Sequence, residues 1–201
     1  MKNYLKMFQQ EILKIKQENK KPTLLLHTCC AMCFSSAYMQ LKDFFQMTVY
    51  FYNPNIYPME EYEKRKNEVL RLIKLFNQEY QTNVNFIEEK DDFNCYLEKK
   101  VHVKGCMDCF HLRLLKSFTY ANKNHYDYVT TTLTVGRLKN SILMNQIAES
   151  LQPMFTKTHY LYSDFKKNNG IEISLNCKEK YGIYAQCYCG CEPYYHNKKT
   201  I

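Results

Sequence analysis

The sequence predicts an α/β fold: one doubly wound, mainly parallel sheet flanked by helices, in a single domain over residues 1–201. Short apolar runs alternate along the chain with segments of ten or more residues that have helical periodicity. Such alternation is typical of parallel strands joined by crossover helices. The chain has the length of one domain, and neither a clear linker nor an internal repeat divides it.

The helices are predicted from apolar residues spaced three and four positions apart. Residues 1–21 carry Leu5, Phe8, Ile12 and Ile15 at this spacing, which predicts an N-terminal amphipathic helix packed on the domain. A longer helix over 59–80 begins acidic and becomes basic, as the helix dipole favours. Further helices are predicted over 34–44, 110–124, 140–151 and 171–180.

The strands are predicted from short apolar runs bounded by turn residues. The first, over 23–28, contains Leu24, Leu25 and Leu26 in succession, which suits a strand buried on both faces. Four more strands are predicted over 47–52, 84–87, 126–131 and 158–162. Ligands of such sheets bind beyond the carboxyl ends of the strands, and Cys29 and Cys30 stand where the first strand should end.

Composition favours a cytoplasmic protein with metal or redox chemistry. The sequence has no run of the roughly 18–20 apolar residues that cross a membrane, and its lysine-rich N-terminus lacks the apolar stretch of a signal peptide. In a reducing compartment, ten cysteines indicate metal binding or redox work rather than disulfides. The net charge of +8 suits a polyanion such as RNA, although a solubility feature would produce the same excess.

Eight of the ten cysteines form three groups. The first, CCAMC over 29–33, lies between a strand and a helix, where thiolates are stabilised. The second, CMDC over 106–109, has the spacing of zinc and iron–sulfur sites. The third, CYCGC over 187–191, contains Gly190, which permits a backbone bend. Cys95 and Cys177 are isolated, and we expect them to be structural.

These eight thiols exceed the four ligands that one zinc ion or one cubane needs. A [4Fe–4S] cluster together with a second metal, or with a redox-active thiol pair, uses the set better than a structural zinc does. Spacing alone favours iron–sulfur over zinc only modestly, so both remain open at this point.

Ordered motifs across the chain resemble those of the QueH-type epoxyqueuosine reductases. The matching runs are HTCCAMC (27–33), FYNPNIYP (51–58), CMDCF (106–110), TTTLT (130–134), DFKKN (164–168) and YCGC (188–191). Each motif alone is unspecific, whereas the ordered set over about residues 24–191 is highly specific. Met32, where the family usually has proline, the additional Cys187 and the loop at 136–138 depart from the family pattern.

The resemblance implies reduction of the epoxide of epoxyqueuosine at the tRNA wobble position to the alkene, the last step of queuosine synthesis. The implied substrates are G-U-N tRNAs for aspartate, asparagine, histidine and tyrosine, with an unidentified electron donor. The implied fold is that of the nucleotide-α-hydrolase-like (HUP-like, Rossmann-like) group. The implied ligands of a [4Fe–4S] cluster are Cys29, Cys30, Cys106 and Cys109. Cys189 and Cys191 match a pair assigned either to redox work or to a second metal, here a mononuclear iron, with Cys33 nearby.

The reaction needs two electrons and a proton donor, for which we consider Asp108, Asp164 and Tyr188 beside the candidate catalytic thiols Cys189 and Cys191. An iron with an open position could act as a Lewis acid on the epoxide oxygen. Solvated surface carboxylates are the simpler interpretation of both aspartates. His27 is expected either to orient the cysteine turn or to be an ordinary buried histidine.

Substrate contacts are expected along the same edge of the sheet. Thr130, Thr131 and Thr132 end the fourth strand, and their hydroxyls could bind the cyclopentane diol or a phosphate. The basic side chains proposed as phosphate contacts are Arg113, Arg137, Lys139, Lys166 and Lys167. Tyrosines are also available to stack on anticodon-loop bases, but the sequence does not select among 18 of them.

Two other functions use the same features. A tRNA-thiolating sulfurtransferase shares this sheet, but it needs a glycine-rich phosphate loop where this chain has the first cysteine group. A zinc- or cluster-stabilised tRNA-binding protein would use the cysteines structurally. The colour and metal content of anaerobically purified protein distinguish zinc from iron–sulfur.

Overall fold

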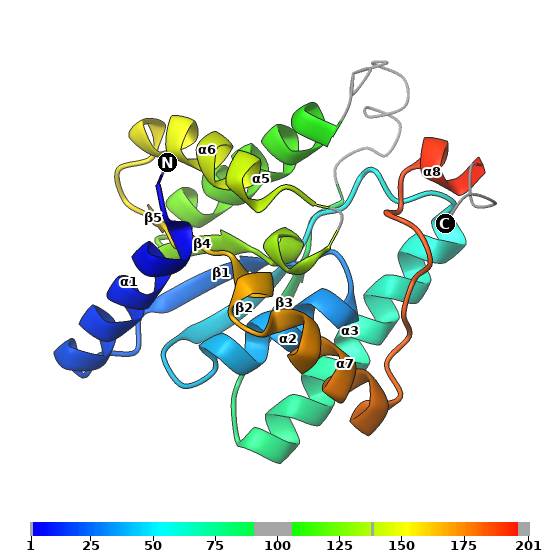
Figure 1. Cartoon of the computed structure of the whole chain (residues 1–201), viewed down its shortest axis with the longest axis horizontal. Coiled ribbons are helices and arrows are strands. Elements are labelled where there is room, and N and C mark those ends of the chain that lie inside the picture. The colour runs from blue at the N-terminus through cyan, green and yellow to red at the C-terminus, as the bar shows by residue number, and fades with distance from the viewer. Residues whose placement is uncertain (1, 91–105, 138, 197–201) are drawn as a thin grey trace.

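Five strands form one parallel sheet with the order β3-β2-β1-β4-β5 (Figure 1). The structure, a computed structural model, describes residues 2–90, 106–137 and 139–196. Every neighbouring pair of strands in the sheet is parallel, which confirms the predicted doubly wound architecture. The strands are β1 Thr23–His27, β2 Gln46–Phe51, β3 Asn85–Glu88, β4 Tyr128–Thr131 and β5 His159–Tyr160.

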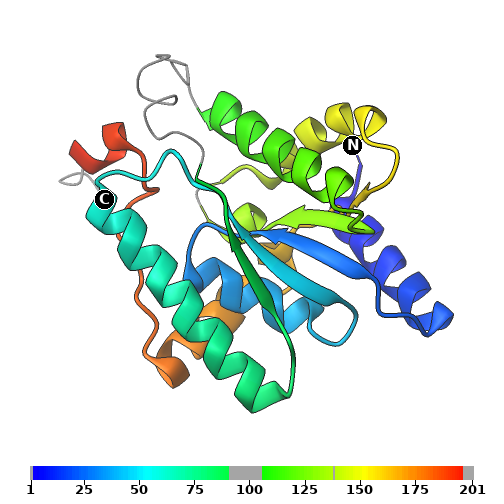
Figure 2. The ribbon, with the colours of Figure 1, turned by 180° about the vertical axis from the view of Figure 1, so that it is seen from behind.

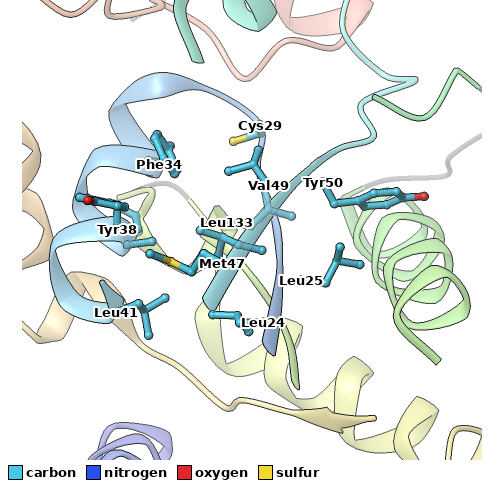
Figure 3. Packing of buried hydrophobic residues seen from close by; sticks show 14 of the residues in the cluster. Leu24, Leu25, Cys29, Phe34, Tyr38, Leu41, Met47, Val49, Tyr50 and Leu133 are labelled. Carbon is cyan, nitrogen blue, oxygen red and sulfur yellow. The ribbon is translucent and has the colours of Figure 1, made fainter. Parts of the chain in front are cut away.

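The central strand β1 is buried on both faces, as its leucine run predicts. Leu24, Leu25 and Leu26 are all fully buried. In Figure 3, Phe34 and Tyr38 pack on one side of the strands, while the ring of Tyr50 lies on the other side. The core therefore has one apolar layer on each face of the sheet.

Helices cover both faces of this sheet (Figures 1 and 2). α5 and α6 lie together on one face, while α2, α3 and α7 lie on the other. The α-helices are α1 Tyr4–Glu18, α2 Ala31–Leu41, α3 Met59–Tyr80, α5 Cys106–Lys123, α6 Ser141–Leu151, α7 Gly170–Tyr181 and α8 Glu192–His196. Three short 3₁₀ helices are η1 Thr132–Val135, η2 Gln152–Met154 and η3 Phe165–Lys167.

Two helices begin earlier than the sequence predicts, and both differences concern cysteines. α2 begins at Ala31 instead of residue 34, and α5 begins at Cys106 instead of residue 110. Cys30 caps α2 with extended backbone and makes no side-chain capping hydrogen bond. The sequence lacks a Ser, Thr, Asp or Asn signal there, so its helix start is hidden. Cys33, Cys106 and Cys109 consequently lie in the first turns of helices.

The N-terminal helix α1 packs beside the β5 edge through aromatic rings. Phe8 meets Phe165 edge to face at 5.5 Å, and Tyr4 stacks on Tyr162 at 5.7 Å between ring centroids. Asn3 caps this helix by accepting a hydrogen bond from the Lys6 amide. In the part of the chain that the structure describes, none of the helices is long and apolar enough to cross a membrane.

Candidate functional site

Three cysteines converge at the carboxyl end of β1 and the N-terminus of α2. Cys29, Cys30 and Cys33 are all buried, and their sulfur atoms all lie within 4.8 Å of one another. The sulfur atoms of Cys29 and Cys30 are 3.8 Å apart. The place where the sequence predicted a site, beyond the end of the first strand, thus holds a preformed group of three potential metal ligands.

The pKa values of these three thiols are shifted in different directions. Hydrogen bonds from Cys30 and Cys33 lower the pKa of the Cys29 thiol well below its ordinary value, and the charges of Lys139 and Arg113 act in the same direction. Donation to Cys29 raises the pKa of Cys30 to about 11 and also raises the pKa of Cys33. Of the three sulfurs, Cys29 is therefore the one whose negative charge its neighbours stabilise.

Two cations face Cys29. Burial opposes the positive charge of Lys139, but its electrostatic interactions with Cys29, Cys189 and Cys33 raise its pKa above the ordinary range. Burial likewise opposes the charge of Arg113, and its electrostatic interactions with Cys109 and Cys29 outweigh this effect and raise its pKa. Anionic sulfur ligands are therefore electrostatically favoured in this position.

Arg113 is 2% exposed and links the sheet to the second cysteine group. Its guanidinium donates to Asn53 Oδ1 at 2.5 Å, lies 3.3 Å from His27 Nε2 and points Nη1 at Cys109 Sγ, 3.9 Å away. Asn53 in turn donates to the carbonyl of Thr28, next to the thiols. The prediction that Arg113 contacts phosphate is therefore wrong, because its side chain is enclosed.

His27 is neutral and ties three segments together. Burial and the charge of Arg113 lower its pKa to about 3. Its Nδ1 pairs with the Thr131 hydroxyl of β4 at 2.8 Å, and its Nε2 lies 3.1 Å from the carbonyl of Tyr52. These contacts go to β4, to Tyr52 and to Arg113, and they are compatible with both interpretations left open by the sequence.

The second cysteine group lies in the first turn of α5. Cys106 is exposed and Cys109 is half-buried. Burial and the charges of Cys189 and Cys109 raise the pKa of Cys106, which places it within electrostatic reach of the terminal cysteines. Among the described residues, however, the thiols within 4.8 Å of Cys29 and Cys30 include Cys33 and not this pair.

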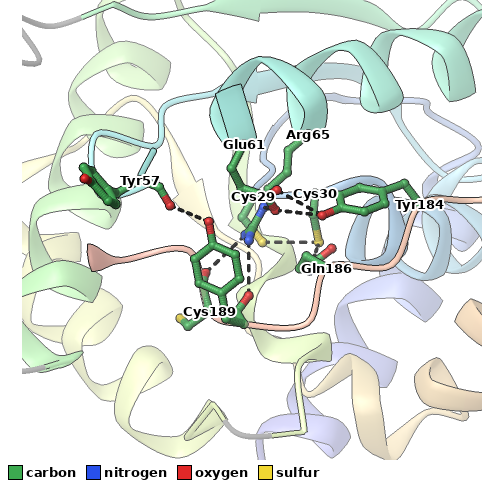
Figure 4. Close-up of polar contacts among 9 residues, drawn as sticks. Cys29, Cys30, Tyr57, Glu61, Arg65, Tyr184, Gln186 and Cys189 are labelled. Carbon is green, nitrogen blue, oxygen red and sulfur yellow. Dashed lines mark hydrogen bonds and ion pairs between the residues drawn. The ribbon is translucent and has the colours of Figure 1, made fainter. Parts of the chain in front are cut away.

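The third group lies on a segment that we call the C-terminal strap, residues 182–191. A hydrogen bond from Cys191 lowers the pKa of Cys189 to about 5 against the effect of burial, and Lys139 and Arg113 contribute. Gln186 of the same strap donates to Cys30 Sγ at 2.9 Å (Figure 4). The strap therefore brings the terminal cysteines to the first group, whereas its Cys187 is exposed.

The three predicted threonines differ in their contacts. Thr130 donates to the Leu161 carbonyl at 2.8 Å, and Thr131 is occupied by His27 and the Leu133 amide. All three are fully buried, and Thr132 Oγ1 lies 4.0 Å from Cys29 Sγ. Thr132 is thus the one whose hydroxyl faces the thiol group, while the other two hydroxyls hold the fold together.

The two candidate proton donors also differ. Asp108 is exposed in the first turn of α5. Asp164 is 4% exposed and forms an ion pair with Lys167 at 3.1 Å, so the interpretation of Asp164 as a solvated surface carboxylate is wrong. Lys166 donates to the Lys139 carbonyl at 2.7 Å, which anchors the loop of that lysine, and Arg137 is exposed.

Comparison with known proteins decides the family. A family model described as epoxyqueuosine reductase QueH matches residues 24–197. The chain belongs to the QueH family. Its relatives include the QueH proteins of Streptococcus pyogenes serotype M1, 37% identical over 94% of this chain and 76% of that protein, and of Staphylococcus epidermidis, 33% identical over 94% and 83%. The QueH protein of Thermotoga maritima is 27% identical over 84% of this chain and 88% of its own.

QueH membership makes this chain an oxidoreductase of queuosine biosynthesis that reduces epoxyqueuosine. A solved structure, the U34-tRNA thiolase NcsA from Methanococcus maripaludis with its [4Fe-4S] cluster, aligns over 95% of this chain and 70% of its own at 12% identity and a TM-score of 0.47. A likeness of that size supports no conclusion about this chain. The donor set of the QueH site itself, clustered thiols beside two cations, fits a metal centre with sulfur ligands.

Sequence reasoning missed the residues that hold the strap. Glu61 and Arg65 on α3 contact the strap, and Gln186 contacts Cys30. A Glu and an Arg four positions apart are usually a solvated pair on a helix surface, so the pattern gives no warning of burial. Cys177 is buried on α7, as expected of a structural cysteine, and Cys95 lies outside the described residues.

Proposed function

We propose that this chain removes the epoxide oxygen of epoxyqueuosine within tRNA, at the wobble position, and so produces queuosine. The observation that carries the proposal is the buried group of Cys29, Cys30 and Cys33 beside Lys139. The proposed substrates are tRNAs with G-U-N anticodons, for aspartate, asparagine, histidine and tyrosine. No observation favours the thiolation alternative, because buried thiols stand where its phosphate loop would be.

The proposed cofactor is a [4Fe–4S] cluster. Cys29 and Cys30 supply two ligands, and Cys33, Cys106 and Cys109 are the thiols available for the others. Bound there, the cluster would supply electrons singly, and conversion of an epoxide to an alkene consumes two electrons and two protons as the oxygen leaves in water. The electron donor is unidentified. We also propose that Cys189 and Cys191 bind a second, mononuclear iron.

The protein's own groups would manage charge and protons around that centre. Lys139 and Arg113 balance the negative charge of the thiolates and keep it stable in a buried place. Cys191 hydrogen-bonds Cys189 and lowers the pKa of the Cys189 thiol, and Cys189 lies within electrostatic reach of Cys29. Asp108, exposed beside Cys109, is the proposed proton donor, with Asp164 held by Lys167 as the less accessible candidate.

The substrate would lie across the rim that these thiols occupy. The proposed phosphate contacts are Arg137, Lys139, Lys166 and Lys167. Of the predicted threonines Thr130, Thr131 and Thr132, we propose that Thr132 contacts the reacting base, because its hydroxyl faces Cys29. Next to the strap, the rings of Tyr57, Tyr195 and His196 gather with centroids 5.3–5.9 Å apart. We propose this aromatic group as the stacking surface for unpaired anticodon-loop bases.

Nucleoside analysis of a deletion strain tests the function. Without the gene, epoxyqueuosine should accumulate in tRNA and queuosine should disappear, and the wild-type gene should restore queuosine. Cys29→Ala should fail to restore it because it removes the central thiolate, whereas the matched Cys177→Ala should succeed. Unchanged queuosine in a strain without another reductase would refute the proposal.

A further inference from the structure

Two charged pairs on α3 hold the C-terminal strap along its length. Glu68 pairs with Arg71 at 2.7 Å, and Glu61 pairs with Arg65 at 2.7 Å, two helical turns nearer the site. The first pair holds the beginning of the strap. Glu68 accepts from the amide of Tyr184 at 2.9 Å, and Arg71 donates to the carbonyl of Tyr181 at 3.0 Å.

The second pair holds the cysteine-bearing end. Arg65 is 1% exposed, and its two terminal nitrogens donate to the carbonyls of Tyr188 and Cys189, each at 3.2 Å (Figure 4). Its Nε is fixed by Glu61, which also accepts from the Tyr184 hydroxyl at 2.9 Å. Two of the three guanidinium nitrogens therefore hold consecutive backbone carbonyls of the strap, and Glu61 fixes the third.

The opposite side of this loop is equally confined. Gly190 has φ +115°, and a Cβ at this residue would lie 2.9 Å from Arg65 Nη1 and 3.2 Å from Ile56 Cγ1. The Gly190 carbonyl accepts from the amide of Tyr57 at 2.7 Å. The loop is thus held between Arg65 on one side and residues 56–57 on the other, and only glycine fits at its bend.

Removing a guanidinium from water costs free energy. If Arg65 only joined a helix to a loop, an apolar side chain could replace it. Here the guanidinium contacts the carbonyl of Cys189 itself, and Gln186 joins the same loop to Cys30. We propose that Arg65 is a positioning residue for the reduction, which fixes the backbone of residues 188–190 and so keeps Cys189 next to the Cys29 group. This inference rests on the proposed function of Cys189 and Cys191.

Arg65→Met and the matched variant Arg71→Met test the inference, because both arginines lie on α3, and Arg71 holds the carbonyl of Tyr181 immediately before the strap instead of the cysteine-bearing end. Deuterium uptake is measured for peptides 181–184 and 185–192 in metal-free protein, together with kcat and KM for an epoxyqueuosine-containing anticodon stem-loop. Arg65→Met should speed exchange in 185–192 at least tenfold and lower kcat at least tenfold while KM changes less than threefold. Arg71→Met should speed exchange in 181–184 and keep kcat within twofold of wild type.

Arg65→Lys should behave like the methionine variant, since one ammonium group cannot hold both carbonyls. If Arg65→Met does not fold, Gly190→Ala decides, because its added carbon displaces the guanidinium while α3 stays intact; it should produce the same exchange and kcat changes. Wild-type exchange and wild-type kcat in these variants would overturn the inference. If the wild-type protein shows no reduction, the proposed function fails. The positioning role is tested separately by deuterium exchange: if residues 185–192 exchange in the variants as slowly as in the wild-type protein, that role is overturned.

Discussion

At the scale of single residues, the site depends on buried cations that the sequence presents as ordinary surface charges. Arg113 lies on a helix face between the sheet and the thiols, with its guanidinium shared by His27, Asn53 and Cys109. The sequence places Arg113 on a predicted helix and the exposed Arg137 in a loop, but it does not indicate that Arg113 is buried. Its burial follows from the sheet contacts of α5, which only the fold provides.

Replacement of Arg113 by methionine should lower the free energy of unfolding by about 2 kcal/mol or more, because Asn53 loses a charged donor in a closed environment. Arg113→Lys should recover little of this loss, since one ammonium cannot reach His27, Asn53 and Cys109 together. Urea denaturation of the metal-free protein measures the change. Arg137→Met, the exposed control, should stay within about 0.5 kcal/mol of wild type; equal losses in both variants would contradict this account.

The cysteines themselves were predictable because their chemistry is specific. Grouping of Cys29, Cys30 and Cys33 beyond a strand end follows from local spacing and from the general position of sites in parallel sheets. Which thiols from distant segments join them does not follow from spacing. Even Asp164, predicted from its motif, has a burial that the sequence did not indicate.

At the scale of elements, packing of α7 against α2 depends on one glycine. A Cβ at Gly170 would lie 2.2 Å from the Phe165 carbonyl and 2.8 Å from Ser36 Oγ. Gly170→Ala should therefore cost about 2–3 kcal/mol of unfolding free energy, because the added carbon must displace the Phe165 backbone and the Ser36 side chain of α2. At Gly182, where φ is +61° but nothing lies within 4 Å of the added carbon, alanine should cost only about 1 kcal/mol. Thermal or urea unfolding compares the two, and equal costs would contradict close packing at Gly170.

The anchoring of the strap to α3 should depend on pH through Glu68. Its hydrogen bonds with Arg71 lower its pKa, burial opposes them, and the Tyr184 amide adds to the lowering. A carboxyl whose pKa is lowered by folding stabilises the protein above its unfolded pKa and loses that effect as the pH falls through the folded value. Wild type should thus be more stable than Glu68→Gln at pH 7, by about 1 kcal/mol.

This difference should shrink steadily below about pH 4.5, near the ordinary glutamate pKa. Urea unfolding at a series of pH values measures it, with the exposed Glu172→Gln as the control that should show no such trend. A stability difference that is constant from pH 7 to pH 3 would contradict the assigned role of Glu68.

The elements were largely predictable, and the exceptions have physical reasons. The helix over Met59–Tyr80 has the predicted bounds because its apolar face and its acidic first turn are both explicit in the sequence. The starts of α2 and α5 were misplaced because cysteines form their first turns, and Cys30 begins α2 without a side-chain cap. The strap was not foreseen, because its structure comes from contacts between residues more than a hundred positions apart, such as Arg65 and Tyr188.

At the scale of the whole molecule, the sheet order places the first cysteine group at the carboxyl edge of the central strand β1. The chain also has a net charge of +8, which suits the proposed RNA partner. Binding of an anticodon stem-loop should therefore weaken at least tenfold between 50 and 200 mM salt, by release of counterions. Fluorescence anisotropy measures this, with a neutral nucleoside as the control that should show little salt dependence. Salt-independent binding of the stem-loop would argue against a phosphate-contacting rim.

That residues 1–201 form one domain remains a prediction.

The central claim is that the thiols gathered at the end of β1 are the centre of epoxide reduction. Its most direct test is turnover of an epoxyqueuosine-containing stem-loop by anaerobically iron- and sulfide-reconstituted protein with dithionite as reductant, followed by nucleoside mass spectrometry. Wild type and Cys177→Ala should both remove one oxygen atom from the base, whereas Cys30→Ala should lose at least 99% of this activity. Turnover by Cys30→Ala at the wild-type rate would contradict the account.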